Sequence, residues 1–139
     1  MSHCIEWRRD RRHIVLPICI VRPAPSDLTA YSGTALLDTG ATATGITARV
    51  ARHLDLTPRG KRLLGSARGE EQVQRYLFRV GLTPDRDPDE PPAFPFLFED
   101  VEGFELRDNF RLDVLLGMDV LSQCDFQMDR RGRCRLAFG

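Results

Sequence analysis

An acidic residue at the end of an apolar run is the feature that most restricts how this chain can fold. Residues 35–42 read Ala-Leu-Leu-Asp-Thr-Gly-Ala-Thr. The apolar residues are typical of a buried β-strand, although alanine and leucine do not by themselves exclude a helix. The Thr-Gly pair predicts a turn, because glycine adopts backbone angles that other residues avoid. Asp38 then either organises the turn through its own backbone or is a functional carboxylate. A carboxylate at the end of a buried strand costs free energy unless it is hydrogen-bonded or its charge is shared.

A second apolar run, far downstream, repeats part of this pattern. Residues 114–119 read Val-Leu-Leu-Gly-Met-Asp. We expect a short strand over residues 114–116 that ends at Gly117, followed by about two helical turns over residues 119–124. Thr47 can cap a helix that runs to about Leu54, so both segments combine an apolar strand, a glycine turn and a helix soon after. This shared pattern is weak evidence of an internal duplication.

The two segments, taken in this order, resemble the signatures of the retropepsin-like aspartic proteases, the family of the retroviral proteases. Residues 35–42 are similar to the active-site loop, and residues 115–121 are similar to the second signature, in which two apolar residues and a glycine precede a short helix. The Gly-Met-Asp form is closer to the retrotransposon and bacterial branches than to the retroviral branch, which usually has an arginine after the glycine. The resemblance implies an all-β fold, a small closed β-barrel-like acid-protease fold with one or two short helices.

The resemblance also implies a role for each residue of the loop. Asp38 would be the catalytic acid and base. Thr39 would hydrogen-bond across a subunit interface, and Gly40 would let the backbone approach the carboxylates and the substrate. Ala41 and Thr42 would line the floor of the loop.

A single Asp-Thr-Gly in 139 residues predicts a homodimer. The chain is too short for the two-lobed form of an aspartic protease, in which each lobe supplies its own aspartate. Hydrolysis needs one ionised and one protonated carboxyl, and a two-fold axis brings the same residue of two copies face to face. We therefore expect an aspartic endopeptidase that uses Asp38 of both subunits on an extended peptide or protein. Leu116 and Gly117 would pack behind the active-site loop, again by resemblance.

A predicted hairpin lies at the point of the chain where the family has a mobile flap. Residues 61–64 and 73–82 are its expected strands, and the second strand alternates apolar and polar residues. The candidate flap tip comprises Ser66, Ala67, Arg68, Gly69 and Glu70. An ordinary surface hairpin is an equal alternative.

The remaining elements are expected from local patterns. Residues 14–21 form a strand in which Pro17 requires a sheet edge or a bulge, and residues 26–33 form a loop. Residues 84–95 form a proline-rich surface loop within a single domain over residues 1–139. Alternation at Phe94, Phe96 and Phe98 predicts a strand. Residues 104–110 are expected to form a connector, and residues 125–138 a closing hairpin.

Composition excludes several classes of function. Twenty basic and twenty acidic residues give zero formal charge, which argues against a dedicated nucleic-acid binder. The sequence lacks a signal-peptide core and an apolar run near the roughly 18 residues of a membrane span, so we expect no membrane partner. The four cysteines form no Cys-x-x-Cys pair and the three histidines are scattered. We therefore expect no metal and no cofactor, and a cytoplasmic protein with reduced thiols.

Two questions stay open at this point: the role of an arginine-rich stretch, and whether the chain is an active dimeric protease. The arginines at positions 8, 9, 11 and 12 surround Asp10, and this stretch is either a solvated lead-in to the first strand or a patch for an acidic partner. Because fold does not dictate function, the chain is alternatively a catalytically silent retropepsin-fold module for dimerisation or peptide binding. A monomer in which Asp38 is purely structural is a third possibility.

Overall fold

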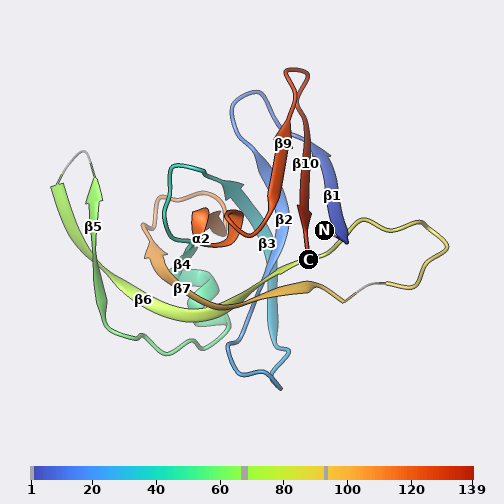
Figure 1. The fold of residues 1–139 in the computed structure, drawn as a ribbon. Coiled ribbons are helices and arrows are strands. Elements are labelled where there is room, and N and C mark those ends of the chain that lie inside the picture. The colour runs from blue at the N-terminus through green and yellow to red at the C-terminus, as the bar shows by residue number, and fades with distance from the viewer. Residues whose placement is uncertain (1, 67–68, 93) are drawn as a thin grey trace.

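Ten strands and two short helices make up the described part of the computed structural model, which covers residues 2–66, 69–92 and 94–139 (Figure 1). The strands are β1 His3–Arg8, β2 Val15–Val21, β3 Ala30–Leu37, β4 Gly45–Thr47, β5 Lys61–Ser66, β6 Gly69–Leu82, β7 Phe96–Leu106, β8 Val114–Leu116, β9 Asp125–Met128 and β10 Arg133–Phe138. Helix α1, Ala48–His53, follows β4, and helix α2, Met118–Leu121, follows β8.

Six strands close into a barrel. Their order is β2-β3-β8-β4-β7-β6, and β6 pairs back onto β2, while β5 extends the sheet beyond β6. The pairs β3–β8 and β4–β7 are parallel, and the other pairs are antiparallel. This architecture confirms the predicted all-β, barrel-like fold with two short helices.

The barrel interior is filled by the apolar faces that the alternation predicted. In β6 the buried side chains of the apolar face are Tyr76, Phe78, Val80 and Leu82, each 6% exposed or less, and Arg79 is buried as well, at 2% exposed. Helix α1 begins where expected, because the Thr47 hydroxyl accepts a hydrogen bond from the amide of Val50. The helix packs Val50 and Ala51 onto the core. Burial of these side chains supplies the main stabilising free energy of the fold.

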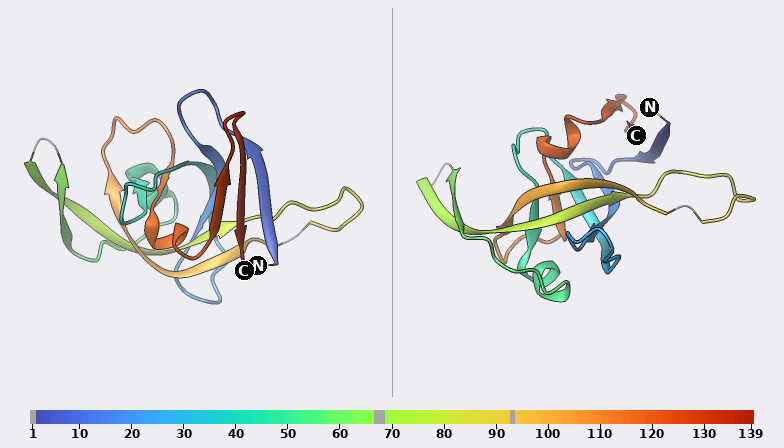
Figure 2. Two further views of the ribbon diagram at one scale, coloured as in Figure 1. Left: turned by 45° about the horizontal axis from the view of Figure 1, so that its top comes forward. Right: turned by 60° about the horizontal axis from the view of Figure 1, so that its bottom comes forward.

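A second, three-stranded sheet contains both ends of the described chain. Its order is β1-β10-β9, and Figure 2 shows it beside the barrel. Residues 9–12 connect β1 to β2, the strand expected at residues 14–21, as the interpretation of a lead-in requires, whereas Arg8 belongs to β1 and pairs with Arg133. Cys134, Leu136 and Phe138 line the buried face of β10, as predicted.

Several element boundaries differ from the sequence-based expectation. Strand β3 starts at Ala30, inside the predicted loop, because residues 30–33 pair with β2. Strand β7 starts at Phe96, which leaves Phe94 61% exposed outside it, and runs on to Leu106 through its pairing with β4. Helix α2 has four residues, one turn rather than two.

Pro17 lies where β2 has a single strand partner. It is paired with Thr34 of β3, whereas the pairing of β2 with β6 covers only Cys19 to Val21. The missing amide hydrogen of proline therefore costs no ladder hydrogen bond on the open side. This arrangement is the local edge that the proline predicted.

Two long excursions leave the barrel in opposite directions (Figures 1 and 2). One is the β5–β6 hairpin. The other is the proline-rich loop between β6 and β7, which has neither helix nor strand in its described residues. This loop is attached to β1, since the Asp85 amide donates to the Cys4 carbonyl and the Glu6 amide donates to the Asp85 carboxylate.

Candidate active site

Parallel pairing of β3 and β8 brings the two sequence signatures to one edge of the barrel. Leu37, the last residue of β3, is opposite Leu116, the last residue of β8. The chain continues from these positions into Asp38 and Gly117. The Asp38 amide donates to the Leu116 carbonyl at 3.0 Å, which ties the start of the loop to the second signature.

The Asp38 loop is a tight turn that leaves its carboxyl accessible. The amide of Gly40 donates to Asp38 Oδ1 at 2.8 Å, and the amide of Ala41 donates to the Asp38 carbonyl at 3.2 Å. Asp38 and Ala41 are half-buried, while Thr39, Gly40 and Thr42 are exposed. Among the described residues none donates to Asp38 Oδ2. One carboxylate oxygen is therefore oriented by the loop, and the other can meet a water, a substrate or another carboxyl.

Gly117 lies directly behind this loop, in contact with its backbone. A Cβ atom at position 117 would stand 2.6 Å from the Ala43 carbonyl oxygen and 3.0 Å from that of Ala41. The amide of Met118 donates to the same Ala41 carbonyl at 2.8 Å. Only glycine permits so close an approach of the two backbones.

A buried hydrogen-bond network that sequence reasoning missed joins the two signatures further. Thr44 is fully buried, and its hydroxyl donates to Asp119 Oδ1 at 2.7 Å and accepts from the Gly117 amide at 3.1 Å. The Thr44 amide donates to Asp119 Oδ2 at 2.9 Å. The available sequence signal was the acid that follows Gly-Met, because a carboxylate in the first turn of a helix favours nearby amides.

Asp113 fixes the opposite end of the β3–β8 pair, at the start of β8. It accepts hydrogen bonds from the Thr34 amide at 3.0 Å and the Tyr31 hydroxyl at 3.1 Å, and it forms an ion pair with Arg49. Burial raises the pKa of Asp113, but the hydrogen bonds from Arg49, Thr34 and Tyr31 outweigh burial and hold the pKa below its usual value. Asp113 thus connects β3 and helix α1 to the start of β8.

The candidate flap belongs to the β5–β6 hairpin. Gly65 pairs with Glu70 and Ser66 with Gly69, so both strands extend closer to the tip than expected, and Ala67 and Arg68 lie outside the described residues. Pairing of β6 with β7 begins only at Arg75, so residues 69–74 continue beyond the barrel.

An ion pair connects this hairpin to the chain beyond β7. Arg107 Nε donates to Glu71 Oε1 at 3.1 Å, and the same two side chains form a salt bridge. Both side chains are well exposed, so the pair makes a modest contribution to stability.

The described residues contain no group of three or more His, Cys, Asp or Glu side chains that could hold a metal ion. Neither helix in this part of the chain is long and apolar enough to cross a membrane. The described cysteines are all free thiols, and burial raises the pKa of Cys124 to about 11.

Comparison with known proteins identifies the fold. Neither a family model nor a curated protein matches the sequence. The structure is similar to the crystal structure of a retropepsin-like aspartic protease from Rickettsia conorii, with a TM-score of 0.65 and 20% sequence identity. The likeness covers 97% of this chain and 90% of that chain. The chain therefore has the fold of the retropepsin-like aspartic proteases.

Proposed function

We propose that the protein is a homodimeric aspartic endopeptidase whose catalytic groups are the two Asp38 carboxyls. The observation that supports this most directly is the accessible Asp38 carboxyl, on a loop fixed to the second signature, in a chain with the retropepsin-like fold. No other carboxylate of the described chain has this combination of exposure and a backbone-fixed loop at the ends of β3 and β8.

The chemistry needs two carboxyl groups that share one proton. Like charges a few ångströms apart resist joint ionisation, so one Asp38 would be ionised and its twin protonated. The ionised carboxylate takes a proton from water as the water oxygen attacks the peptide carbonyl carbon. The protonated carboxyl donates its proton to the carbonyl oxygen. The tetrahedral intermediate then collapses as the C–N bond breaks: the carboxyl that took the proton of water gives it to the nitrogen, and the other carboxylate takes a proton from a hydroxyl of the intermediate, so that a carboxylic acid and an amine leave and the pair again holds one proton.

The dimer follows from the single Asp38 of each chain. An isologous interface brings residue 38 of both copies to the two-fold axis. In this proposal Thr39 hydrogen-bonds across the axis, Gly40 allows close approach of the substrate, and Ala41 and Thr42 line the floor. An extended peptide would lie over the loops, between them and the β5–β6 hairpins, in the strand-like form that proteases commonly bind.

Replacement of Asp38 tests the proposal. The Asp38→Asn protein should retain its circular dichroism spectrum and its sedimentation coefficient but lose cleavage of an unfolded protein substrate by at least about a thousandfold. The Asp87→Asn protein, with the same chemical change in the exposed 83–95 loop, is the matched control and should cleave normally. Undiminished cleavage by Asp38→Asn protein contradicts the proposal. A wild-type protein that dimerises and binds peptides without cleaving them indicates the silent module instead.

A further inference from the structure

Two arginine-rich segments from opposite ends of the sequence meet at one end of the molecule. The amide of Arg9 donates to the Gly132 carbonyl at 2.9 Å, and Arg8 Nη1 donates to the Arg131 carbonyl at 3.4 Å. Figures 1 and 2 show the loop after β1 beside the tip of the β9–β10 hairpin. Pairing of β1 with β10 therefore collects charges that lie more than a hundred residues apart in the sequence.

We call this surface the arginine face. It consists of Arg8, Arg9, Arg11, Arg12, Arg130, Arg131, Arg133 and Arg135. All of them are exposed except Arg9, which is half-buried. Residues 8–13 and 129–135 contain these eight arginines and two aspartates, a formal charge of +6 in a chain whose total is zero. The rest of the chain carries the balancing negative charge, so a net charge of zero for the whole sequence is compatible with a strongly basic surface at one end of the folded molecule.

The two aspartates are occupied by the backbone of their own loops. Asp10 Oδ1 accepts from the amides of Arg12 and His13, and Asp129 Oδ1 accepts from the amides of Arg131 and Arg133. The side chain of Arg133 also binds Asp129. Among the described residues no carboxylate forms an ion pair with the arginines at positions 11, 12, 130 and 131. Their guanidinium groups face solvent with unused hydrogen-bond donors.

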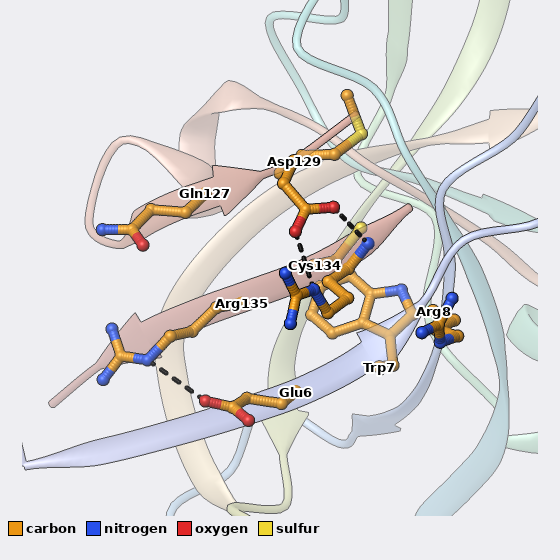
Figure 3. Close-up of a pocket in the computed structure, with 9 residues that line it drawn as sticks. Glu6, Trp7, Arg8, Gln127, Asp129, Cys134 and Arg135 are labelled. Atoms are coloured by element: carbon orange, nitrogen blue, oxygen red, sulfur yellow. Dashed lines mark hydrogen bonds and ion pairs between the residues drawn. The ribbon is translucent and has the colours of Figure 1, made fainter. Parts of the chain in front are cut away.

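A groove of about 570 Å³ crosses the adjoining sheet and continues the arginine face. Figure 3 shows Arg8 and Arg135 at this groove together with Trp7. Met128, which is 49% exposed, adds apolar surface. The indole nitrogen of Trp7 is buried without an acceptor. The groove therefore combines cationic donors with apolar contact area.

An acidic polypeptide fits this surface better than a nucleic acid does. Arginine forms bidentate hydrogen bonds with carboxylates as readily as with phosphates. Two carboxylates, Glu6 and Asp129, also line the groove, and Arg135 Nε lies 3.6 Å from Glu6 Oε1. They would repel a phosphate backbone, which carries a charge at every step, whereas a peptide can put neutral side chains opposite them. We propose that the arginine face and its groove bind an acidic, extended segment of a partner polypeptide.

Binding at this surface can be measured separately from proteolysis. We suggest fluorescence anisotropy of a labelled peptide of alternating glutamate and alanine, with a peptide in which glutamine replaces glutamate and an oligothymidylate of equal charge as comparisons. Trp7 is the only tryptophan of the chain, so its emission reports occupancy of the groove. The Arg130→Gln/Arg131→Gln protein removes two exposed cations. The Arg59→Gln/Arg111→Gln protein removes two exposed cations elsewhere and is the matched control.

The proposal predicts saturable binding of the glutamate peptide that shifts Trp7 emission and weakens with added salt. Affinity should fall about tenfold in the Arg130→Gln/Arg131→Gln protein and stay within about twofold in the control. Absence of saturable binding overturns the proposal, as does equal weakening in the control protein. If the oligothymidylate binds more tightly than the glutamate peptide, the proposal is also wrong, and the arginine face is a nucleic-acid-binding surface. Binding does not require the Asp38 carboxyl, so an inactive enzyme that still binds the peptide separates this proposal from the proposed protease activity.

Discussion

At the scale of single residues, the carboxylates around the candidate active site divide by what they contact. Asp38 has an oxygen that no described residue occupies, whereas both oxygens of Asp113 and of Asp119 accept hydrogen bonds, all of them from other elements except the bond from the Val120 amide. A saturated carboxylate is fixed in place and contributes to stability. An incompletely satisfied carboxylate at the surface is available for chemistry.

The Thr44 hydroxyl should contribute about 2 kcal/mol to the stability of the fold, because its loss leaves the buried Gly117 amide without an acceptor and removes one of the donors to Asp119 Oδ1. We expect the Thr44→Val protein, which keeps the shape of the side chain, to unfold at lower urea concentration by this amount. The Thr44→Ser protein keeps the hydroxyl and should lose less. Equal stability of the valine variant and the wild type would show that the network is not stabilising.

Asp113 should make stability depend on acid pH. Its pKa is lowered in the folded state, so its contribution is fully present above the unfolded pKa of about 3.9 and is lost as pH falls through the lower folded value. We expect the Asp113→Asn protein to be less stable at neutral pH and to lose less further stability between about pH 4 and 2. Urea unfolding at several pH values measures this, with Asp108→Asn as an exposed control. Parallel curves for wild type and Asp113→Asn would contradict the assignment.

At the scale of elements, the contact between the two strand ends depends on a missing side chain. The Gly117→Ala protein must push the new methyl group against the Ala43 carbonyl, 2.6 Å away, and we expect a loss of about 1–3 kcal/mol. A methyl group added at Gly65, in strand β5, would meet no atom within 4 Å, so Gly65→Ala should be neutral or slightly stabilising. Thermal unfolding of the two variants checks the contrast. A Gly117→Ala protein as stable as Gly65→Ala would mean that the loop moves aside at no cost.

Elements with local sequence signals could be predicted, whereas elements fixed by distant contacts could not. Strands β3 and β8 and helix α1 follow from local signals, namely apolar runs, a glycine and the Thr47 cap. Strand β1 alternates charged residues with apolar ones, and the contacts that fix it are distant in sequence: its pairing with β10 and its hydrogen bonds with Asp85. The contact between Thr44 and Asp119 likewise joins residues 75 positions apart, which no local pattern specifies. The position of Gly117 behind the Asp38 loop was expected from the resemblance, but the Thr44–Asp119 network beside it was not.

At the scale of the whole molecule, each chain is half of the proposed catalytic unit, and this makes mixing of subunits informative. A heterodimer of wild-type and Asp38→Asn chains has one ionisable Asp38 and should be inactive. If subunits exchange freely, active dimers vary as the square of the wild-type fraction, so addition of an equal amount of Asp38→Asn chains should reduce the activity of the wild-type chains to about half. The reduction should develop at the rate of subunit exchange and be absent immediately after mixing. Activity that stays constant while sedimentation shows complete exchange would mean that one Asp38 is sufficient, and the paired-carboxyl mechanism would then be wrong.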